Sequence, residues 1–188
     1  MESSALPRLI ARDYDGVPWY YEPPVYLPHR FILGTVGEKP LACIGINPST
    51  ARPGALDNTL KSVQRLALAN GFDSFLMFNV YAQRATRPND MERVCNEALH
   101  RANMEAFDYI LSLSEQPAVW AAWGNIIEQR AYLKDCLADM IAIGERHGAQ
   151  WYTAGRRSVK GHPHHPLYLK ATSPLDAFDI RAYCAECL

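Results

Sequence analysis

Apolar and polar positions follow two patterns along this chain. Short, nearly continuous apolar runs are typical of strands covered on both faces, and they occur at residues 41–46, 74–80, 118–124 and 149–155. Longer segments carry apolar residues at helical spacing, and these lie near 57–71, 91–114 and 126–144. Strands that alternate with helices predict an α/β fold with three layers, in which a central, mostly parallel sheet of four strands is covered by helices on both faces.

The segments at the two ends of the chain complete this prediction. Residues 1–29 are rich in Pro and Tyr, and we expect them to form an irregular arm on a single domain that spans residues 1–188. Residues 30–36 have the composition of a strand. The segment 173–183, SPLDAFDIRAY, predicts a terminal helix capped by Ser173.

Composition excludes several classes of protein. The chain has 188 residues, of which 48% are apolar, as in a globular domain. It contains no apolar run long enough to cross a membrane, and its first residues lack the features of a signal peptide. The five cysteines are scattered and odd in number, which favours reduced thiols in a cytoplasmic protein. A net charge of −1 excludes a basic protein overall but allows a local basic patch.

Polar side chains gather in the segments that follow the predicted strands. The carboxyl ends of parallel strands meet at one edge of a sheet, where α/β proteins place their sites. These segments contain amides, hydroxyls, basic residues and histidines: Asn47, Ser49, Thr50, Asn79, Arg84, Arg87, Asn125, Arg156, Arg157, Lys160, His162, His164 and His165. We therefore expect the functional site at this edge.

Ordinary structural roles compete with this interpretation. Asn47–Pro48 is a common turn after a strand, and Asn79 could be a satisfied polar group at a strand end. The arginines could belong to a solvated face. The histidines near 162–165, together with the C-x-x-C of Cys184 and Cys187, could bind zinc, but a second spaced pair is missing. We therefore expect no metal and no other cofactor.

Four segments resemble motifs of the uracil-DNA glycosylase superfamily, in the order that the superfamily has them. GINPS at 45–49 resembles the first motif, in the GINPG form of the mismatch-specific branch. FLMFNV at 75–80 and VWAAWGN at 119–125 are similar to two strands of the superfamily, and GHPHHPL at 161–167 resembles its late His-Pro-Ser-Pro loop. This resemblance implies a glycosylase-like fold.

A second resemblance is more specific in sequence and carries no assigned reaction. Members of domain of unknown function 1643 have the motifs NPSTA, D-x-T, RAT and HPLYL. This chain has them at residues 47–51, 57–59, 84–86 and 165–169.

The glycosylase resemblance implies a role for each matching residue. Asn47 would hold the water that attacks the sugar, Pro48 would shape the turn, and Asn79 would read the edge of a pyrimidine. His165 or His162 would donate to the departing base, and we prefer His165. Ser49 stands where the fast uracil-specific branch has an aromatic residue, so it would leave room for a substituent at C5. The remaining contacts would go to DNA: Leu167 and Tyr168 as wedges, and Arg84, Arg87, Arg156, Arg157 and Lys160 at phosphates.

These observations predict a DNA glycosylase that removes a uracil-like or C5-modified pyrimidine after base flipping. The partner would be duplex or single-stranded DNA, with no membrane and no obligate protein partner. Two alternatives stay open. One is a nucleic-acid-binding protein that keeps the fold without cleavage, and the other is a hydrolase of a small nucleotide-like molecule.

Overall fold

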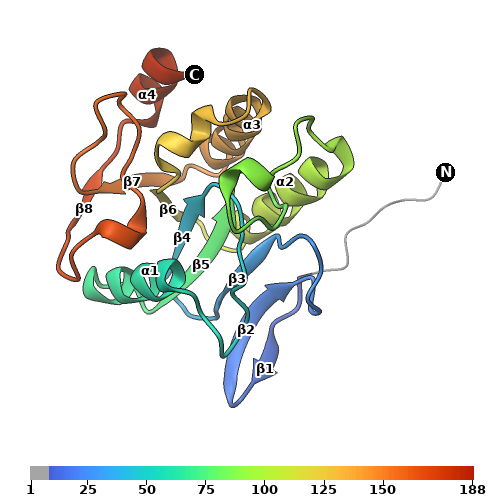
Figure 1. Ribbon diagram of the computed structural model, residues 1–188. Coiled ribbons are helices and arrows are strands. Elements are labelled where there is room, and N and C mark those ends of the chain that lie inside the picture. Colours follow the sequence, from blue (N-terminus) through green and yellow to red (C-terminus); the bar gives the residue numbers. More distant parts are fainter. Residues whose placement is uncertain (1–8) are drawn as a thin grey trace.

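A computed structural model describes residues 9–188 (Figure 1). Its strands are β1 (Arg12–Tyr14), β2 (Val17–Glu22), β3 (Ile32–Thr35), β4 (Pro40–Gly45), β5 (Ser74–Asn79), β6 (Ala118–Ala121), β7 (Gln150–Ala154) and β8 (Leu175–Ala177). Its α-helices are α1 (Asn58–Ala69), α2 (Glu97–Leu111), α3 (Tyr132–Arg146) and α4 (Ile180–Cys187). Three short 3-10 helices are η1 (Pro88–Asp90), η2 (Gly124–Glu128) and η3 (Pro166–Tyr168).

All eight described strands belong to one sheet, in the order β1-β2-β3-β5-β4-β6-β7-β8. The α/β class is therefore confirmed, whereas the prediction of a four-stranded, mostly parallel sheet is wrong. Four of the seven strand pairings are antiparallel. The three parallel pairings join β5, β4, β6 and β7 in the middle of the sheet. Of the antiparallel strands, β3 lies within the predicted strand 30–36, whereas β1, β2 and β8 were missed. β1 and β8 have only three residues each, and proline interrupts the pattern of β2.

Side chains of the central strands alternate between two apolar layers. In β4, Leu41 and Cys43 pack with α1, while Ala42 and Ile44 pack on the other face. That second face is covered by α2, α3 and α4, so the sheet lies between two helical layers, as Figure 1 shows. Every residue of β5 is buried, which explains why such strands read as continuous apolar runs.

The first residues of the chain are more regular than expected. The predicted irregular arm, 1–29, contains the hairpin β1–β2, and only its residues 1–8 lie outside the described part. Trp19 and Tyr21 alternate inward from β2, and the Trp19 ring packs edge-on against Phe75 at 6.0 Å. Because these two side chains are buried, this part of the predicted arm forms a strand. Its prolines interrupt the apolar pattern by which the strand could have been recognised in the sequence.

The predicted helix boundaries also shift, because side-chain caps decide where each helix begins. The Asn96 side chain accepts a hydrogen bond from Leu99 N, so α2 starts later than the predicted 91–114. The predicted helix 126–144 divides into η2 and α3. At the C-terminus, Leu175–Ala177 pairs with β7 as a strand, and Asp179 rather than Ser173 caps the final helix.

Candidate functional site

The carboxyl ends of β5, β4, β6 and β7 lie side by side at one edge of the sheet. We call this the carboxyl edge. Gly45, the last residue of β4, pairs with Asn79, the last residue of β5. Asn47 follows β4 and Gly124 follows the adjacent strand β6, so both residues lie at this edge. The sequence motifs NPSTA, RAT and HPLYL all follow these strands, so the fold brings them to the same edge.

The RAT segment holds the NPST segment in place. Asn47 Nδ2 donates to the carbonyl oxygens of Ala85 at 2.7 Å and Pro48 at 3.1 Å. Ala85 N donates back to Pro48 O at 2.9 Å. Both amide hydrogens of Asn47 are thereby used, and its Oδ1 accepts no hydrogen bond from the described residues. A half-buried Asn47 thus presents an acceptor from a rigid strand terminus.

Two arginines bind the carbonyl groups of the same segment. Arg84 Nη1 donates to Ser49 O and to Ala51 O, and Arg30 Nη1 also donates to Ala51 O, at 3.3 Å. Burial, and the nearby charge of Arg84, lower the pKa of Arg30 to about 9. Within residues 9–188, the backbone N–H groups of Ser49, Thr50 and Ala51 have no hydrogen-bond acceptor. The arginines therefore fix a loop in which Ala51 is buried, while the N–H groups of the less buried Ser49 and Thr50 remain available as donors.

Arg84 is consequently not placed as a phosphate contact. Its Nη2 donates to the Tyr21 hydroxyl at 3.3 Å, and its guanidinium carbon lies 4.2 Å from the centre of the Tyr26 ring. A guanidinium stacked on one ring and bonded to two carbonyls has a structural role. Nothing in the residues around position 84 indicates this, because its acceptors lie more than thirty residues away in the sequence.

His165 lies directly beside Gly124, which has a φ of +62°. A Cβ at Gly124 would lie 3.6 Å from the His165 Cβ. His165 Nδ1 accepts a hydrogen bond from Leu167 N at 3.3 Å, so the proton of the neutral ring is on Nε2. Burial, followed by the charge of His164, lowers the pKa of His165 below its ordinary value of 6.5. His165 is therefore a neutral imidazole with an Nε2–H donor.

His162 has a different environment and is only 1% exposed. Trp123 Nε1 donates to the Tyr183 hydroxyl at 2.9 Å, and that hydroxyl donates to His162 Nδ1 at 2.9 Å. His162 Nε2 then donates to Glu128 Oε1 at 3.3 Å. Both ring nitrogens are thus occupied in a buried chain of hydrogen bonds. His162 therefore has a structural role, whereas His165 still has a ring nitrogen that can bond to a ligand.

Asn79 lies beneath the edge rather than at its surface. It is 1% exposed, and its Oδ1 would be 3.1 Å from a Cβ at Gly45. Its Nδ2 is buried without a partner among the described residues, while its backbone carbonyl accepts from Asn103 Nδ2 at 2.8 Å. A base can reach this amide only if the packing around Gly45 opens. The structure does not bring Asn79 together with Asn47 and His165 at an accessible surface.

A groove of about 850 Å³ lies beside His165, between the segment after β7 and η3. The predicted residues that line it are Arg156, Arg157, His165 and Tyr168. Arg157 forms an ion pair with Glu186 at 3.8 Å, whereas no described carboxylate pairs with Arg156. Lys160 is ion-paired with Glu128 outside the groove lining, and Arg87 lies on the separate loop that precedes η1. The predicted basic patch is therefore smaller than the five residues proposed from the sequence.

Asp57 begins the D-x-T motif at 57–59 and was not among the residues predicted for the site. Its Oδ1 accepts from Leu60 N at 2.9 Å, as a cap should. Its negative charge also opposes the lowering of the pKa of both Arg30 and His165, which burial mainly causes. Its presence in the D-x-T motif was the signal that could have identified it.

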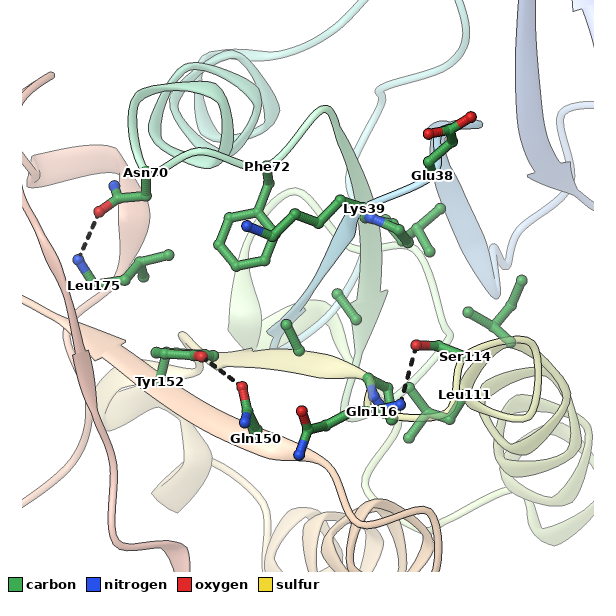
Figure 2. A pocket seen from close by; sticks show the side chains of 16 residues that line it. Glu38, Lys39, Asn70, Phe72, Leu111, Ser114, Gln116, Gln150, Tyr152 and Leu175 are labelled. Carbon is green, nitrogen blue, oxygen red and sulfur yellow. Dashed lines mark hydrogen bonds between the residues drawn. The ribbon is translucent and has the colours of Figure 1, made fainter.

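A second cavity, of about 390 Å³, lies at the opposite edge, where the central strands begin (Figure 2). It is lined by residues at the starts of three strands, Pro40, Ala118 and Gln150. Figure 2 shows Lys39 extended toward Phe72, with its ammonium group 5.2 Å from the ring centre. None of the residues predicted for the site lines this cavity.

The described chain offers no group of three or more His, Cys, Asp or Glu side chains placed to hold a metal ion. All five cysteines are free thiols. No helix in residues 9–188 is long and apolar enough to cross a membrane.

The fold and the edge together define an α/β protein with a candidate site at the ends of its central parallel strands. The chain belongs to the family described as "Protein of unknown function (DUF1643)", whose model matches residues 30–167. The match includes the motifs at 47–51, 57–59 and 84–86, and His165. Neither the curated proteins nor the solved structures contain a match to this chain.

Proposed function

We propose that this protein hydrolyses the N-glycosidic bond of a uracil-like or C5-modified pyrimidine in DNA. The observation that carries the proposal is that one edge of the sheet holds both a free acceptor and a free donor. Asn47 Oδ1 is the acceptor, directly after β4, and His165 Nε2–H is the donor, beside Gly124 in the segment after the neighbouring strand β6. The resemblance of GINPS and the late histidine loop to glycosylase motifs supports the same reaction.

In this reaction the C1′–N bond breaks, and its electron pair leaves with the base. Asn47 Oδ1 accepts a hydrogen bond from a water, whose oxygen forms the new bond to C1′. The amide cannot act as a base, so the proton of that water passes to solvent. Positive charge on the sugar and negative charge on the base develop together, and a preorganised site stabilises them without reorganisation.

The departing base gains negative charge on its oxygen atoms. His165 Nε2–H is suited to donate there, because its Nδ1 is held by Leu167 N. The free N–H groups of Ser49 and Thr50 supply further donors in the adjoining loop. The small side chain of Ser49 leaves space beside C5. The mechanism uses neither His162 nor Asn79, since the first is fully hydrogen-bonded and the second is buried.

Mass spectrometry of released bases tests this proposal. The panel contains duplex and single-stranded DNA with uracil, thymine mispairs and 5-modified cytosines. We expect release of at least one base by the wild-type protein and none by Asn47→Ala. Wild-type protein that binds DNA but releases no base would indicate a binding protein. Protein that neither binds nor cleaves DNA would indicate an enzyme for a small nucleotide-like molecule.

A further inference from the structure

Exposed apolar side chains gather in the loops of the carboxyl edge. Six of the thirteen large, exposed hydrophobic residues of the described chain lie in two of its connecting segments, the one between β2 and β3 and the one between β7 and β8: Val25, Tyr26, Leu27, Val159, Leu167 and Tyr168. Single exposed apolar residues are common on any protein, whereas a cluster around a candidate site indicates a binding surface. We infer that this surface binds single-stranded nucleic acid, with Tyr26 and Tyr168 stacking on bases on either side of the proposed reaction centre. This inference rests on the proposed function.

Tyr26 lies on the β5 side of Asn47. The loop that carries it is joined to the segment after β5, because Arg84 N donates to Pro28 O at 2.8 Å. The Arg84 guanidinium covers one face of the Tyr26 ring, and the residue is still 54% exposed. The adjoining Ala85 O accepts the amide of Asn47. Arg84 therefore positions the Tyr26 ring for stacking, close to the segment that binds Asn47.

Tyr168 lies on the opposite side, in η3. It is 77% exposed, and its ring centre is 6.4 Å from that of His165. It lines the groove together with Arg156 and Arg157, which are exposed and can reach phosphates. This combination of an aromatic ring with arginines is the one that binds a single strand without a strong sequence preference.

The segments that carry the two tyrosines and the two reactive groups lie next to successive strands of the sheet. Tyr26 is in the loop bonded to the segment after β5, and Asn47 follows β4. His165 lies beside Gly124, which follows β6, and Tyr168 lines a groove with the segment after β7. Three strand spacings of about 4.8 Å give about 14 Å across these four strands, a distance that a few nucleotides of an unpaired strand can span. A target base at Asn47 and His165 would therefore have a neighbouring base within reach of each tyrosine.

The geometry favours an unpaired strand over a duplex. A tyrosine ring can stack on a base only when that face of the base is uncovered, and in a duplex the next base pair covers it. In a single strand each base can turn toward the protein, so no cost of base flipping has to be met.

Binding to a fluorescent oligonucleotide without any target base tests the inference independently of catalysis. The wild-type protein should bind the single strand at least tenfold more tightly than a duplex of the same sequence. Tyr26→Ala and Tyr168→Ala should each weaken single-strand binding about tenfold to a hundredfold. Tyr26→Phe and Tyr168→Phe keep the ring and should bind nearly as wild type. Tyr109→Ala, at an exposed tyrosine of α2, is the matched control and should change nothing.

The outcomes separate this inference from the proposed function. Tighter binding to the duplex, or alanine variants that bind like Tyr109→Ala, would overturn the inference even if bases are released. Single-strand binding that depends on both tyrosines, combined with no base release from the panel, would overturn only the proposed reaction. The phenylalanine variants show whether any loss in the alanine variants reflects stacking rather than a disturbed fold.

Discussion

The two edges of the sheet differ in how their polar groups are used. At the opposite edge, the more enclosed cavity is lined by Asn70, whose Nδ2 donates to two carbonyls and whose Oδ1 accepts from Leu175 N. The Tyr152 hydroxyl is likewise bonded to Gln150. At the carboxyl edge, Asn47 Oδ1 and His165 Nε2–H lack partners among the described residues. The carboxyl edge therefore differs from the opposite edge in presenting polar groups that are rigidly held and still free.

The largest expected effect comes from Asn47. Asn47→Ala removes the acceptor that positions the attacking water, so base release should fall below detection while DNA binding stays largely intact. Single-turnover release assays and binding titrations measure the two properties separately. Gln116→Ala, at the rim of the opposite cavity, should leave both unchanged. Equal losses in the two variants would remove the distinction between the edges.

His165 should have the next largest effect. Loss of one donor to a developing anion slows a reaction by about two to three powers of ten, so His165→Ala should reduce the rate constant for base release by about that factor. His165→Gln can restore part of it, because an amide also donates. A rate that does not change in His165→Ala would assign the stabilisation of the base to the backbone N–H groups of the NPST segment instead.

The buried chain around His162 should respond in stability rather than in activity. Tyr183→Phe leaves Trp123 Nε1–H and His162 Nδ1 without partners. An unsatisfied buried group costs about 1–3 kcal/mol, so the loss of partners for two groups should lower the free energy of unfolding by about 2–6 kcal/mol. Urea denaturation measures this change. Base release at a temperature where the variant is folded should match wild type, and a large loss of rate there would return His162 to the reaction.

The sequence allowed the central elements to be predicted because their signals are local. Near-continuous apolar runs marked β4, β5, β6 and β7, and the polar segments after them located the carboxyl edge. The hairpin of β1 and β2 was missed, since its burial depends on contacts such as Trp19 with Phe75, far apart in the chain. A contact between residues far apart in the chain cannot be recognised from a local apolar pattern, and proline interrupts that pattern here.

The roles of individual site residues were harder to predict for the same reason. His162 and His165 lie in one short loop and look equivalent in sequence, yet Tyr183 and Trp123 occupy only the first. Arg84 resembles a phosphate contact until its carbonyl acceptors are known. In each case a partner distant in sequence decides whether a side chain is used by the fold or left for a ligand.

The smallest expected effect is on the pH dependence of stability, and it again differs between the two edges of the sheet. Burial lowers the pKa of His165, so between this lowered value and the ordinary value near 6.5 the unfolded chain binds more protons than the folded one. Stability must then fall as pH falls through that window. His165→Gln, which cannot titrate, should lose less stability between pH 7.5 and 5.5 than wild type.

His29 supplies a second test of the same argument. It lies beside Gln83 in the loops of the carboxyl edge, and burial, followed by the charge of Arg84, lowers its pKa. His29→Gln should therefore remove a further part of the pH dependence of stability. No described histidine lines the opposite cavity, so that cavity should not contribute to this dependence. Urea denaturation of the two single variants and the double variant at pH 7.5 and 5.5 measures how much each histidine contributes to the pH dependence of stability. A double variant that keeps the full wild-type dependence would show that proton uptake on unfolding occurs away from the carboxyl edge.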